Sequence, residues 1–355
     1  MSSAHPQRAA EIVDLRSDTV TLPTDAMFEA MRSAPLGDDS RDGDPTARAL
    51  EQKAANLTGK AAALFVPSGT MGNLLAMLAH GGRGGEVFSD AGAHLFNSEI
   101  GSVVTVAGLV PRPVPSHRGA MQEEPLAQAI SATASAGRPR PALIWMETTH
   151  NGAGGAVLSL AHMARVHALG RSNGIAVHVD GARLFNAAVA LGVSAQQIAA
   201  HADSLMFCVS KGLSAPVGSL LVGDAALIAQ ARAFRRIIGG NMRQAGVIAA
   251  AGLVALDSMI ARLRDDHEAA QRLARGLAWL DPALAATGHV QTNILRIDTS
   301  GSAQSAAEWT SRLKAQGILV QASGASQLRL VTHRHIDRAA VERTLAAFAA
   351  VAPKV

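Results

Sequence analysis

The stretch "DSLMFCVSKGLSAPVGSLLVG" (residues 203–223) sets one amine between two strongly apolar runs. Residues 204–210 and 218–223 are apolar almost without interruption, which is typical of strands that are covered on both faces of a sheet. Lys211 lies between these runs, in the tripeptide Ser-Lys-Gly. Burial beside other positive charge leaves an amine nucleophilic, so Lys211 is a candidate Schiff-base lysine. The alternative is an ordinary lysine in a surface loop.

Similar runs recur along the first two thirds of the chain and alternate with Ala/Leu-rich segments of helical period. This alternation is typical of a sheet with helices on both faces. Together with the two runs above, the expected strands cover residues 62–68, 86–90, 102–108, 141–148 and 175–181. The sequence therefore predicts an α/β fold, whose large domain contains a mostly parallel seven-stranded sheet flanked by helices.

The pattern changes after Gln244, where a long Ala/Leu/Arg-rich helical region begins. Beyond it we expect a smaller C-terminal α+β domain, with strands at 293–298, 318–322 and 327–332, a helix at 306–317 and a final helix. The expected organisation is thus a loose N-terminal leader (1–13), a large domain (14–255) and a small domain (256–355).

Composition argues against several classes of protein. The formal net charge is only +4 and the arginines are scattered, without the basic run and aromatic residues that nucleic-acid binding favours. Cys208 is the only cysteine, so an intrachain disulfide is excluded. His333 and His335 lack a third nearby ligand, and we expect no metal site. Apolar runs are too short for a signal peptide or a membrane span, so we expect a soluble, cytoplasmic protein with no membrane partner.

Polar residues gather where the expected strands end. Asp180 closes the strand in "VHVDGAR", and "PSGTMGN" (67–73) leads from a strand into an amphipathic helix. Ligands of open α/β sheets bind at the carboxyl ends of the strands, and the amides of a helix N-terminus bind phosphate. An aspartate after a strand is also a common turn residue, and the loop lacks the Walker and dinucleotide-binding spacings. The order phosphate loop, aspartate, lysine resembles that of pyridoxal-phosphate enzymes with the aspartate-aminotransferase fold.

Longer strings narrow this resemblance to the low-specificity L-threonine aldolases, from about residue 12 to the C-terminus. The strings are "DLRSDTVTLPTDAM" (14–27), "DPT" (44–46), "LFVPSGTMGN" (64–73), "HVDGARLFNA" (178–187), "MFCVSKGLSAPVGS" (206–219), "NMRQAG" (241–246) and "LRLVTH" (328–333). The resemblance implies a fold type I enzyme that uses pyridoxal 5'-phosphate to cleave L-β-hydroxy-α-amino acids, such as L-threonine and L-allo-threonine, reversibly into glycine and an aldehyde.

The resemblance also implies roles for single residues around the cofactor. Lys211 would carry the cofactor as a Schiff base and Asp180 would pair with its pyridine nitrogen, since a protonated ring is the better electron sink. Gly69 and Thr70 would hold the phosphate. His94 would stack on the ring and could touch the substrate hydroxyl, although a single histidine is more often structural. An ordered water is the other candidate for the hydroxyl's base.

The remaining matched positions concern the substrate and a second subunit. Ser17, Arg183 and Arg329 match positions that hold the substrate carboxylate, with Arg183 also among the expected cofactor contacts; a capping serine and two surface arginines are the alternatives. Arg236 and Arg243 match positions that reach the cofactor phosphate of a neighbouring subunit, or are helix-surface charges. The resemblance implies a homo-oligomer, expected to be a tetramer, with active sites at a dimer interface.

Two departures from the family pattern leave the substrate open. The chain reads "DDSRDGDPT" (38–46), with Arg41 where relatives usually have a tyrosine, and it contains no tyrosine at all. The segment "SAGRPRP" (135–141) is shortened and lacks a histidine that relatives often carry. A preference for a bulkier substrate such as phenylserine is therefore a second hypothesis. The sequence also fits a β-eliminating lyase or aminotransferase of the same fold, or a catalytically idle binding protein.

Overall fold

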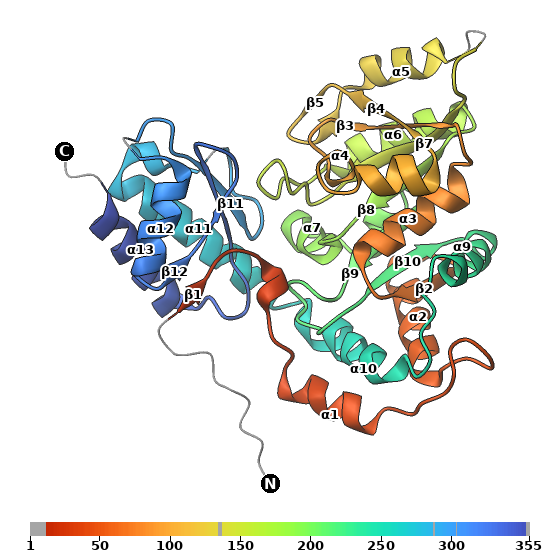
Figure 1. Ribbon diagram of the computed structural model, residues 1–355, viewed down its shortest axis with the longest axis horizontal. Helices are drawn as coiled ribbons and strands as arrows, with labels where there is room; N and C mark the ends of the chain where they lie inside the picture. The colour runs from red at the N-terminus through yellow and green to blue at the C-terminus, as the bar shows by residue number, and fades with distance from the viewer. Residues whose placement is uncertain (1–11, 134–136, 287, 303, 353–355) are drawn as a thin grey trace. The chain divides into compact units, whose positions relative to one another are not determined.

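The computed structural model describes residues 12–133, 137–286, 288–302 and 304–352. It divides into two compact units, one from Leu22 to Ala261 and the other combining the N-terminal segment up to Thr21 with Arg262 onward (Figure 1). The leader expected at residues 1–13 falls almost wholly outside the described residues. Each unit has its own sheet, so each is described by itself.

The larger unit is built on a seven-stranded sheet in the order β2-β10-β9-β8-β7-β3-β4. Strands β9, β8, β7, β3 and β4 run parallel, and only β10 is antiparallel to its two neighbours. The strands are β2 (Ala62–Val66), β3 (Glu86–Asp90), β4 (Val110–Val114), β7 (Pro141–Glu147), β8 (Ala176–Asp180), β9 (Ser204–Cys208) and β10 (Ser219–Gly223). The predicted α/β fold with a mostly parallel seven-stranded sheet is confirmed.

One of the seven expected strands is wrong. Residues 102–108, rich in β-branched side chains, form the π-helix η2 (Ser102–Ala107), and β4 takes the place in the sheet. Val103 and Ala107 lie four residues apart and are both buried, so packing of one helical face outweighs β-propensity here. The sequence of β4, "VPRPV", does not suggest a strand because of its prolines, but an edge strand tolerates them, and β4 lies at the edge.

Helices pack on this sheet in two groups. Helix α3 packs on β8, β9 and β10 and against α9. In the other group α8 contacts both α2 and α6, α2 packs on β2 and β10, and α6 packs on β8. The helices of the larger unit are α1 (Asp25–Ser33), α2 (Pro45–Thr58), α3 (Gly69–His80), α4 (His94–Asn97), α5 (Glu123–Ala132), α6 (Leu160–Ser172), α7 (Leu184–Leu191), α8 (Ala195–Ala199), α9 (Ala225–Ile237) and α10 (Gly246–Val254), followed by the π-helix η3 (Ala255–Met259). The hairpin β5 (Ser116–His117) and β6 (Ala120–Met121) lies outside the main sheet.

The smaller unit is an α+β structure, as expected. Its antiparallel sheet has the order β11-β14-β13, and the buried rings of Trp309 and Phe348 stack in its core with centroids 5.5 Å apart. Its elements are β1 (Val13–Asp14), η1 (Asp18–Val20), α11 (Leu263–Leu280), η4 (Pro282–Leu284), β11 (Ile294–Asp298), α12 (Ala306–Ala315), β12 (Ile318–Leu319), β13 (Gln321–Ala322), β14 (Gln327–Val331) and α13 (Arg338–Val351).

The boundary between the units differs from the expected one in two respects. The C-terminal part begins at Arg262, a few residues after the expected position 256. Residues 14–21, expected in the large domain, belong to the smaller unit because β1 pairs in parallel with β12, with Val13 opposite Ile318. A pairing between positions about 300 residues apart leaves no local signal in the sequence.

The helical region after Gln244 is interrupted. Helix α10 continues into η3, and α11 begins only at Leu263. Among the described residues, no single helix has the length and apolar composition of a membrane span. The bent pair Gly246–Met259 and Leu263–Leu280 meets that test only when its two parts are taken together.

A buried ion pair fixes the loop that precedes α2. Arg235 of α9 is 1% exposed; its guanidinium contacts Asp39 at 2.5 Å and donates to the Phe65 carbonyl at 2.7 Å. The second arginine near Asp39 is Arg232, 3.7 Å away and 40% exposed in its side chain. Removing one partner of a buried pair leaves the other charge without compensation.

We therefore expect Arg235→Ala to lower the free energy of unfolding of the apoprotein by about 3–5 kcal/mol, the usual cost of breaking a buried pair. Urea denaturation followed by circular dichroism measures the change. Arg171→Ala, at an exposed position near the end of α6, is the matched control and should cost under about 0.5 kcal/mol. Equal losses in the two variants would contradict the assignment.

Candidate active site

Asp180, the last residue of β8, is a buried carboxylate among other acids. It is 3% exposed, accepts the Ala182 amide at 3.0 Å and accepts Asn73 Nδ2 at 2.9 Å. Burial is the largest cause that raises the pKa of Asp180 to about 6, followed by the charges of Glu147 and Glu99. Lys211 and, when it is protonated, His94 lower the pKa of Asp180 through their positive charge. A carboxylate in this environment favours a cationic partner.

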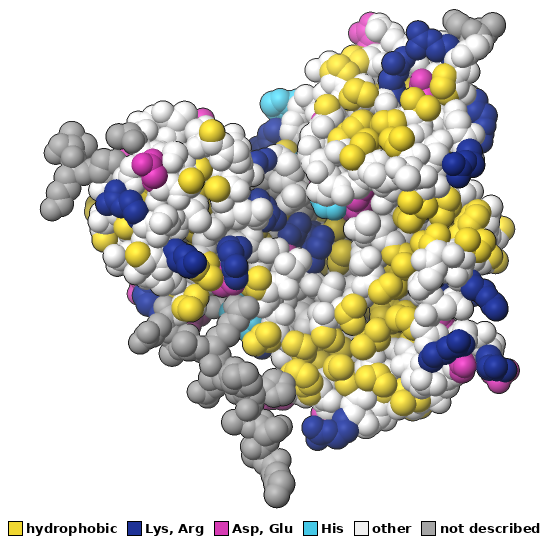
Figure 2. Space-filling model, in the orientation of Figure 1, with side chains coloured by type: hydrophobic (Ala, Val, Ile, Leu, Met, Phe, Trp, Pro, Cys, Tyr) yellow, Lys and Arg dark blue, Asp and Glu magenta, His cyan; other side chains and the backbone are white. Residues whose placement is uncertain are grey.

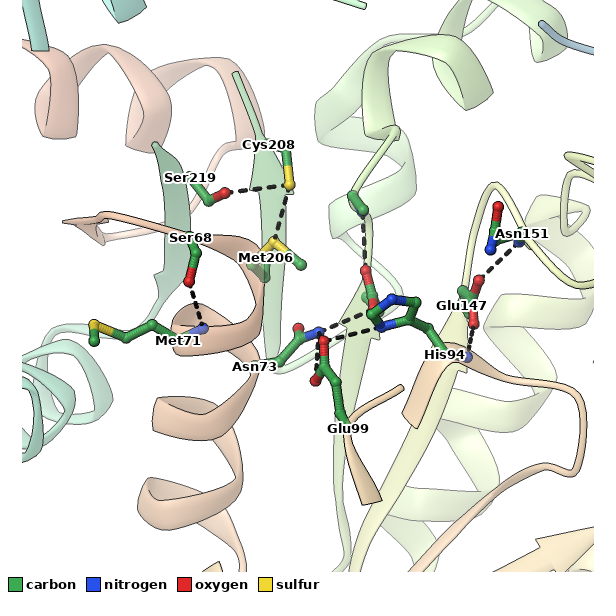
Figure 3. Close-up of polar contacts among 12 residues, drawn as sticks. Ser68, Met71, Asn73, His94, Glu99, Glu147, Asn151, Met206, Cys208 and Ser219 are labelled. Atoms are coloured by element: carbon green, nitrogen blue, oxygen red, sulfur yellow. Dashed lines mark hydrogen bonds and ion pairs between the residues drawn. The ribbon is translucent and has the colours of Figure 1, made fainter. Parts of the chain in front are cut away.

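Asn73 of α3 connects this carboxylate with that of Glu99. Figure 3 shows the Asn73 and Glu99 side chains directed toward each other. Its Nδ2 lies 3.2 Å from both oxygens of Glu99, and its Oδ1 accepts from His178 Nε2 at 3.3 Å. Burial lowers the pKa of His178 well below its usual range, so the ring is neutral, and its Nδ1 accepts the Ser204 hydroxyl at 2.7 Å. Since each donor has an acceptor, the orientation of the Asn73 amide is fixed.

Lys211 lies on a tight turn just after β9. The Ser214 amide donates to the Lys211 carbonyl at 2.8 Å, and the Ala215 amide returns to the Val209 carbonyl at 3.0 Å. Ser214 adopts φ of 65°, a left-handed conformation that is uncommon for a residue other than glycine. The lysine is thus half-buried on a closed turn and close enough to Asp180 to affect its titration.

The start of α3 lies against β9, which is the strand that leads to Lys211. Ser68 caps the helix by accepting the Met71 amide at 3.2 Å. A Cβ on Gly69 would lie 3.0 Å from Cys208 Sγ, and one on Gly72 would lie 2.7 Å from a Met206 side-chain carbon. These glycines therefore allow the helix N-terminus to reach the end of β9 (Figure 3). Its first turn is partly open to solvent, as a phosphate site requires.

His94 opens the short helix α4 next to this acidic cluster. Its Nδ1 lies 3.0 Å from Glu99 Oε1, and its backbone amide donates to Glu147 Oε2 at 2.6 Å. The hydrogen bond to Glu99 is the largest cause that raises the pKa of His94, and Asp180 raises it further. Ligand-type atoms of His94, Glu99 and Asp180 lie within 4.8 Å of one another.

A second histidine fixes the loop after β7. His150 Nε2 donates to Asp90 Oδ2 at 2.7 Å and its Nδ1 accepts the Ala153 amide at 3.0 Å. The neighbouring Glu147 accepts the Asn151 amide at 2.8 Å, and the Thr148 amide donates to the Asp180 carbonyl at 3.0 Å. The loop is thereby tied to the ends of both β3 and β8, which holds Glu147 in place.

The expected substrate residues occupy structured positions. Ser17 caps η1 by accepting the Thr19 amide at 3.2 Å, and Arg329 of β14 donates to the Arg16 carbonyl at 3.0 Å; both belong to the smaller unit. Arg183, in the larger unit, directly precedes α7 and is 6% exposed. Arg183 and Arg329 are thus mostly buried and are not surface charges. Ser17 makes the contact of a helix-capping serine, which was the alternative interpretation of this residue.

Arg236 and Arg243 line a cavity in the larger unit. Its volume is about 560 Å³, and Ser40, Arg41 and Asn241 also line it. Asp38 lies 3.7 Å from the guanidinium of Arg41 and 3.8 Å from that of Arg243. Three guanidinium groups therefore face one cavity with the Asp38 carboxylate beside them, which favours an anionic ligand.

The structure thus gathers Lys211, Asp180, His94 and the start of α3 at the carboxyl ends of the parallel strands. The sequence did not single out the residues that surround them: Asn73, Glu99, Glu147 and His178. Asn73 and Glu147 follow or end expected strands, so their position was a usable signal. Glu99 has no such signal, because only the fold of 94–99 turns it back toward His94.

An amine, a buried carboxylate that favours a cation and an open helix N-terminus fit the aldehyde, the ring nitrogen and the phosphate of pyridoxal 5'-phosphate. The fold is that of fold type I enzymes, and a solved structure of threonine aldolase from Leishmania major has the same fold (TM-score 0.81, 16% identity, 94% of this chain and 97% of that chain covered).

Comparison of sequences gives the family. Residues 14–300 match the beta-eliminating lyase family. The chain is 43% identical over 340 residues to low-specificity L-threonine aldolase 1 of Arabidopsis thaliana (95% of both chains), and 40% identical over 333 residues to low specificity L-threonine aldolase of Escherichia coli K12 (92% of this chain, 95% of the relative). This chain therefore belongs to the beta-eliminating lyase family and, within it, to the low-specificity L-threonine aldolases.

The raised pKa of Asp180 predicts an effect of pH on the apoprotein. The pKa of the Asp180 carboxyl rises from 3.8 to about 6 on folding, so the folded state binds this proton more tightly than the unfolded state. The resulting stabilisation is complete below pH 4 and is lost as the pH rises through 6. At pH 8 we expect Asp180→Asn to be more stable than the wild type by up to about 3 kcal/mol, with the difference vanishing near pH 4. Urea denaturation at both pH values measures it.

The same substitution should weaken binding of pyridoxal 5'-phosphate, because an amide cannot compensate a pyridinium charge. Equilibrium dialysis is the readout. A stability difference that does not change with pH would contradict the stated environment of Asp180.

Proposed function

We propose that this chain cleaves L-β-hydroxy-α-amino acids, with L-threonine and L-allo-threonine as the first candidates, into glycine and an aldehyde with pyridoxal 5'-phosphate as cofactor. The observation that carries the proposal is the buried carboxylate of Asp180 beside the half-buried Lys211, at the strand ends where this family's motifs lie. Membership of the low-specificity L-threonine aldolases supports the substrate class.

When bound, the cofactor supplies an electron sink for the bond that breaks at Cα. Lys211 would hold the cofactor's aldehyde carbon, Asp180 its protonated ring nitrogen, and Gly69 and Thr70 its phosphate. His94, with an exposed fraction of 35% in its side chain, would lie against the ring. Asp180 would contribute to reactivity because its buried carboxylate would keep the ring nitrogen protonated.

Substrate orientation decides which bond at Cα is cleaved. Ser17, Arg183 and Arg329 remain the predicted ligands of the substrate carboxylate, since a guanidinium matches a carboxylate with two parallel hydrogen bonds. A fixed carboxylate would restrict rotation of the substrate about the bond between its nitrogen and Cα, and would thereby select the Cα–Cβ bond for cleavage. The arginines would therefore govern reaction specificity as well as affinity.

A β-elimination is the nearest second function, because the family as a whole is described as beta-eliminating lyases. Its products would be a keto acid and ammonia rather than glycine and an aldehyde. A preference for phenylserine remains a prediction from the sequence, based on Arg41 and the shortened segment 135–141.

Assembly with a second copy is part of the proposal. Hydrophobic side chains gather on the larger unit over α1 and α10, where Leu22, Leu36 and Val247 are exposed (Figure 2). An exposed apolar patch of this kind favours association, and the arginine cavity would then receive the phosphate bound by the partner. A tetramer and a cytoplasmic location remain predictions from the sequence.

The direct test is to mix purified holoprotein with L-threonine, L-allo-threonine and L-phenylserine and to measure glycine and aldehyde together. We expect stoichiometric glycine and aldehyde from at least one substrate and a loss of about 10³-fold or more in kcat for Lys211→Ala. Lys314→Ala, on α12 of the smaller unit, is the control and should keep full activity. 2-Oxobutyrate from either threonine, or phenylpyruvate from L-phenylserine, with ammonia would identify a β-eliminating lyase, and full activity of Lys211→Ala would overturn the proposal.

Mixing two inactive variants tests whether Arg243 serves a neighbouring subunit. Lys211→Ala and Arg243→Ala should each be impaired alone, whereas equal amounts dissociated and reassembled together should recover roughly a quarter of wild-type sites, because half of randomly formed dimers are hybrids with one intact site. Recovery no greater than the average of the separate variants would show that both residues act within one chain.

A further inference from the structure

We infer that Glu99 is a positioning residue for the proposed reaction: it holds His94 with Nδ1–H directed to its own carboxylate and thereby leaves Nε2 to exchange the proton of the substrate's β-hydroxyl. The inference rests on the proposed function, and it chooses between the two candidate bases that the sequence left open, His94 and an ordered water. It assigns a role to a carboxylate that no sequence motif indicated.

The direction of the hydrogen bond follows from the chemistry of its partners. His94 Nδ1 and Glu99 Oε1 are 3.0 Å apart, and the Glu99 side chain is only 2% exposed. Both Glu99 oxygens also accept from Asn73 Nδ2, at 3.2 Å each. An ionised carboxylate can only accept hydrogen bonds, so with Glu99 ionised the hydrogen of this bond belongs to Nδ1.

Asn73 cannot reverse this arrangement. Its Oδ1 accepts from His178 Nε2, and Ser204 occupies the other nitrogen of that buried ring. The amide group of Asn73 must therefore present its hydrogens to Glu99 and Asp180, which keeps both carboxylates as acceptors. The tautomer of His94 is thus set by a chain of hydrogen bonds that begins in the interior of the sheet.

The other ring nitrogen of His94 is the reactive one. Within the described part of the chain Nε2 has no hydrogen-bond partner, and the His94 side chain is 35% exposed, whereas that of Glu99 is buried. A neutral imidazole with Nδ1–H has its lone pair on Nε2, which can accept a proton. Three carboxylates, those of Glu99, Asp180 and Glu147, surround the ring and strengthen it as a base.

The proposed proton transfer is balanced. The hydroxyl proton passes to Nε2, the O–H electron pair forms the carbonyl of the aldehyde, and the Cα–Cβ pair remains on Cα. Cα then takes up one proton and glycine is formed, so threonine gives glycine and acetaldehyde with no oxidant or reductant. Glu99 itself exchanges no proton and only fixes the imidazole.

The test begins with the apoprotein, labelled with ¹⁵N in histidine, and with His94 assigned by comparison with His94→Asn. We expect the ¹⁵N shifts of neutral His94 to show hydrogen on Nδ1, and we expect Glu99→Gln to lower the pKa of His94 through loss of the hydrogen bond to a charged acceptor. A wild-type ring with hydrogen on Nε2 would overturn the inference, even if Glu99→Gln does not fold.

The second readout is the pH dependence of kcat/KM in the holoenzyme. Glu99→Gln should lower kcat/KM about 10- to 100-fold and move the acidic limb to lower pH with the His94 pKa, while cofactor affinity changes less than about threefold. Glu51→Gln, a buried glutamate on α2 that bonds Arg232, is the control and should leave the limb in place. If the acidic limb of the pH profile of kcat/KM stayed in place in Glu99→Gln, the proposed role of His94 Nε2 would be contradicted. If the wild type forms no aldehyde, the proposed function fails while the tautomer result still tests the pairing.

Discussion

The site depends on one unfavourable burial, that of the Asp180 charge. Its carboxylate lies out of water with Glu99 and Glu147 nearby, and these neighbours and its burial raise its pKa to about 6. An uncompensated charge in this position destabilises the fold, so the environment selects a ligand that brings a positive charge. A protonated pyridine ring is such a ligand. The same negative field favours protonation of His94, so two properties of the site have one cause.

The architecture of the larger unit brings the candidate site residues to one edge of its sheet. Parallel strands end at one edge of the sheet, and this edge receives Asp180 from β8 and, by the turn after β9, Lys211. Helix α3 reaches the same edge because Gly69 and Gly72 leave no Cβ to meet Met206 and Cys208. The same helix contributes Asn73, so one element supplies both the proposed phosphate site and the link between two carboxylates. Sites held on strands and helices in this way are well ordered geometrically.

Much of this was readable from the sequence, and the failures have physical reasons. Lys211 and Asp180 follow long apolar runs, and strand ends are where α/β proteins bind ligands, so position alone indicated them. Residues 102–108 were assigned wrongly because helical packing of Val103 and Ala107 outweighed their β-propensity. The pairing of Val13 with Ile318 and the contact of Glu99 with His94 depend on the folded chain and have no local pattern.

The central claim is that one amine, Lys211, carries the cofactor opposite the buried acid. Reduction of the holoprotein with borohydride, followed by digestion and mass spectrometry, tests it most directly because the chain has only five lysines. The account predicts one pyridoxyl phosphate group per chain, on the peptide that contains Lys211. A label on any other lysine, or a protein that retains no label, would contradict it.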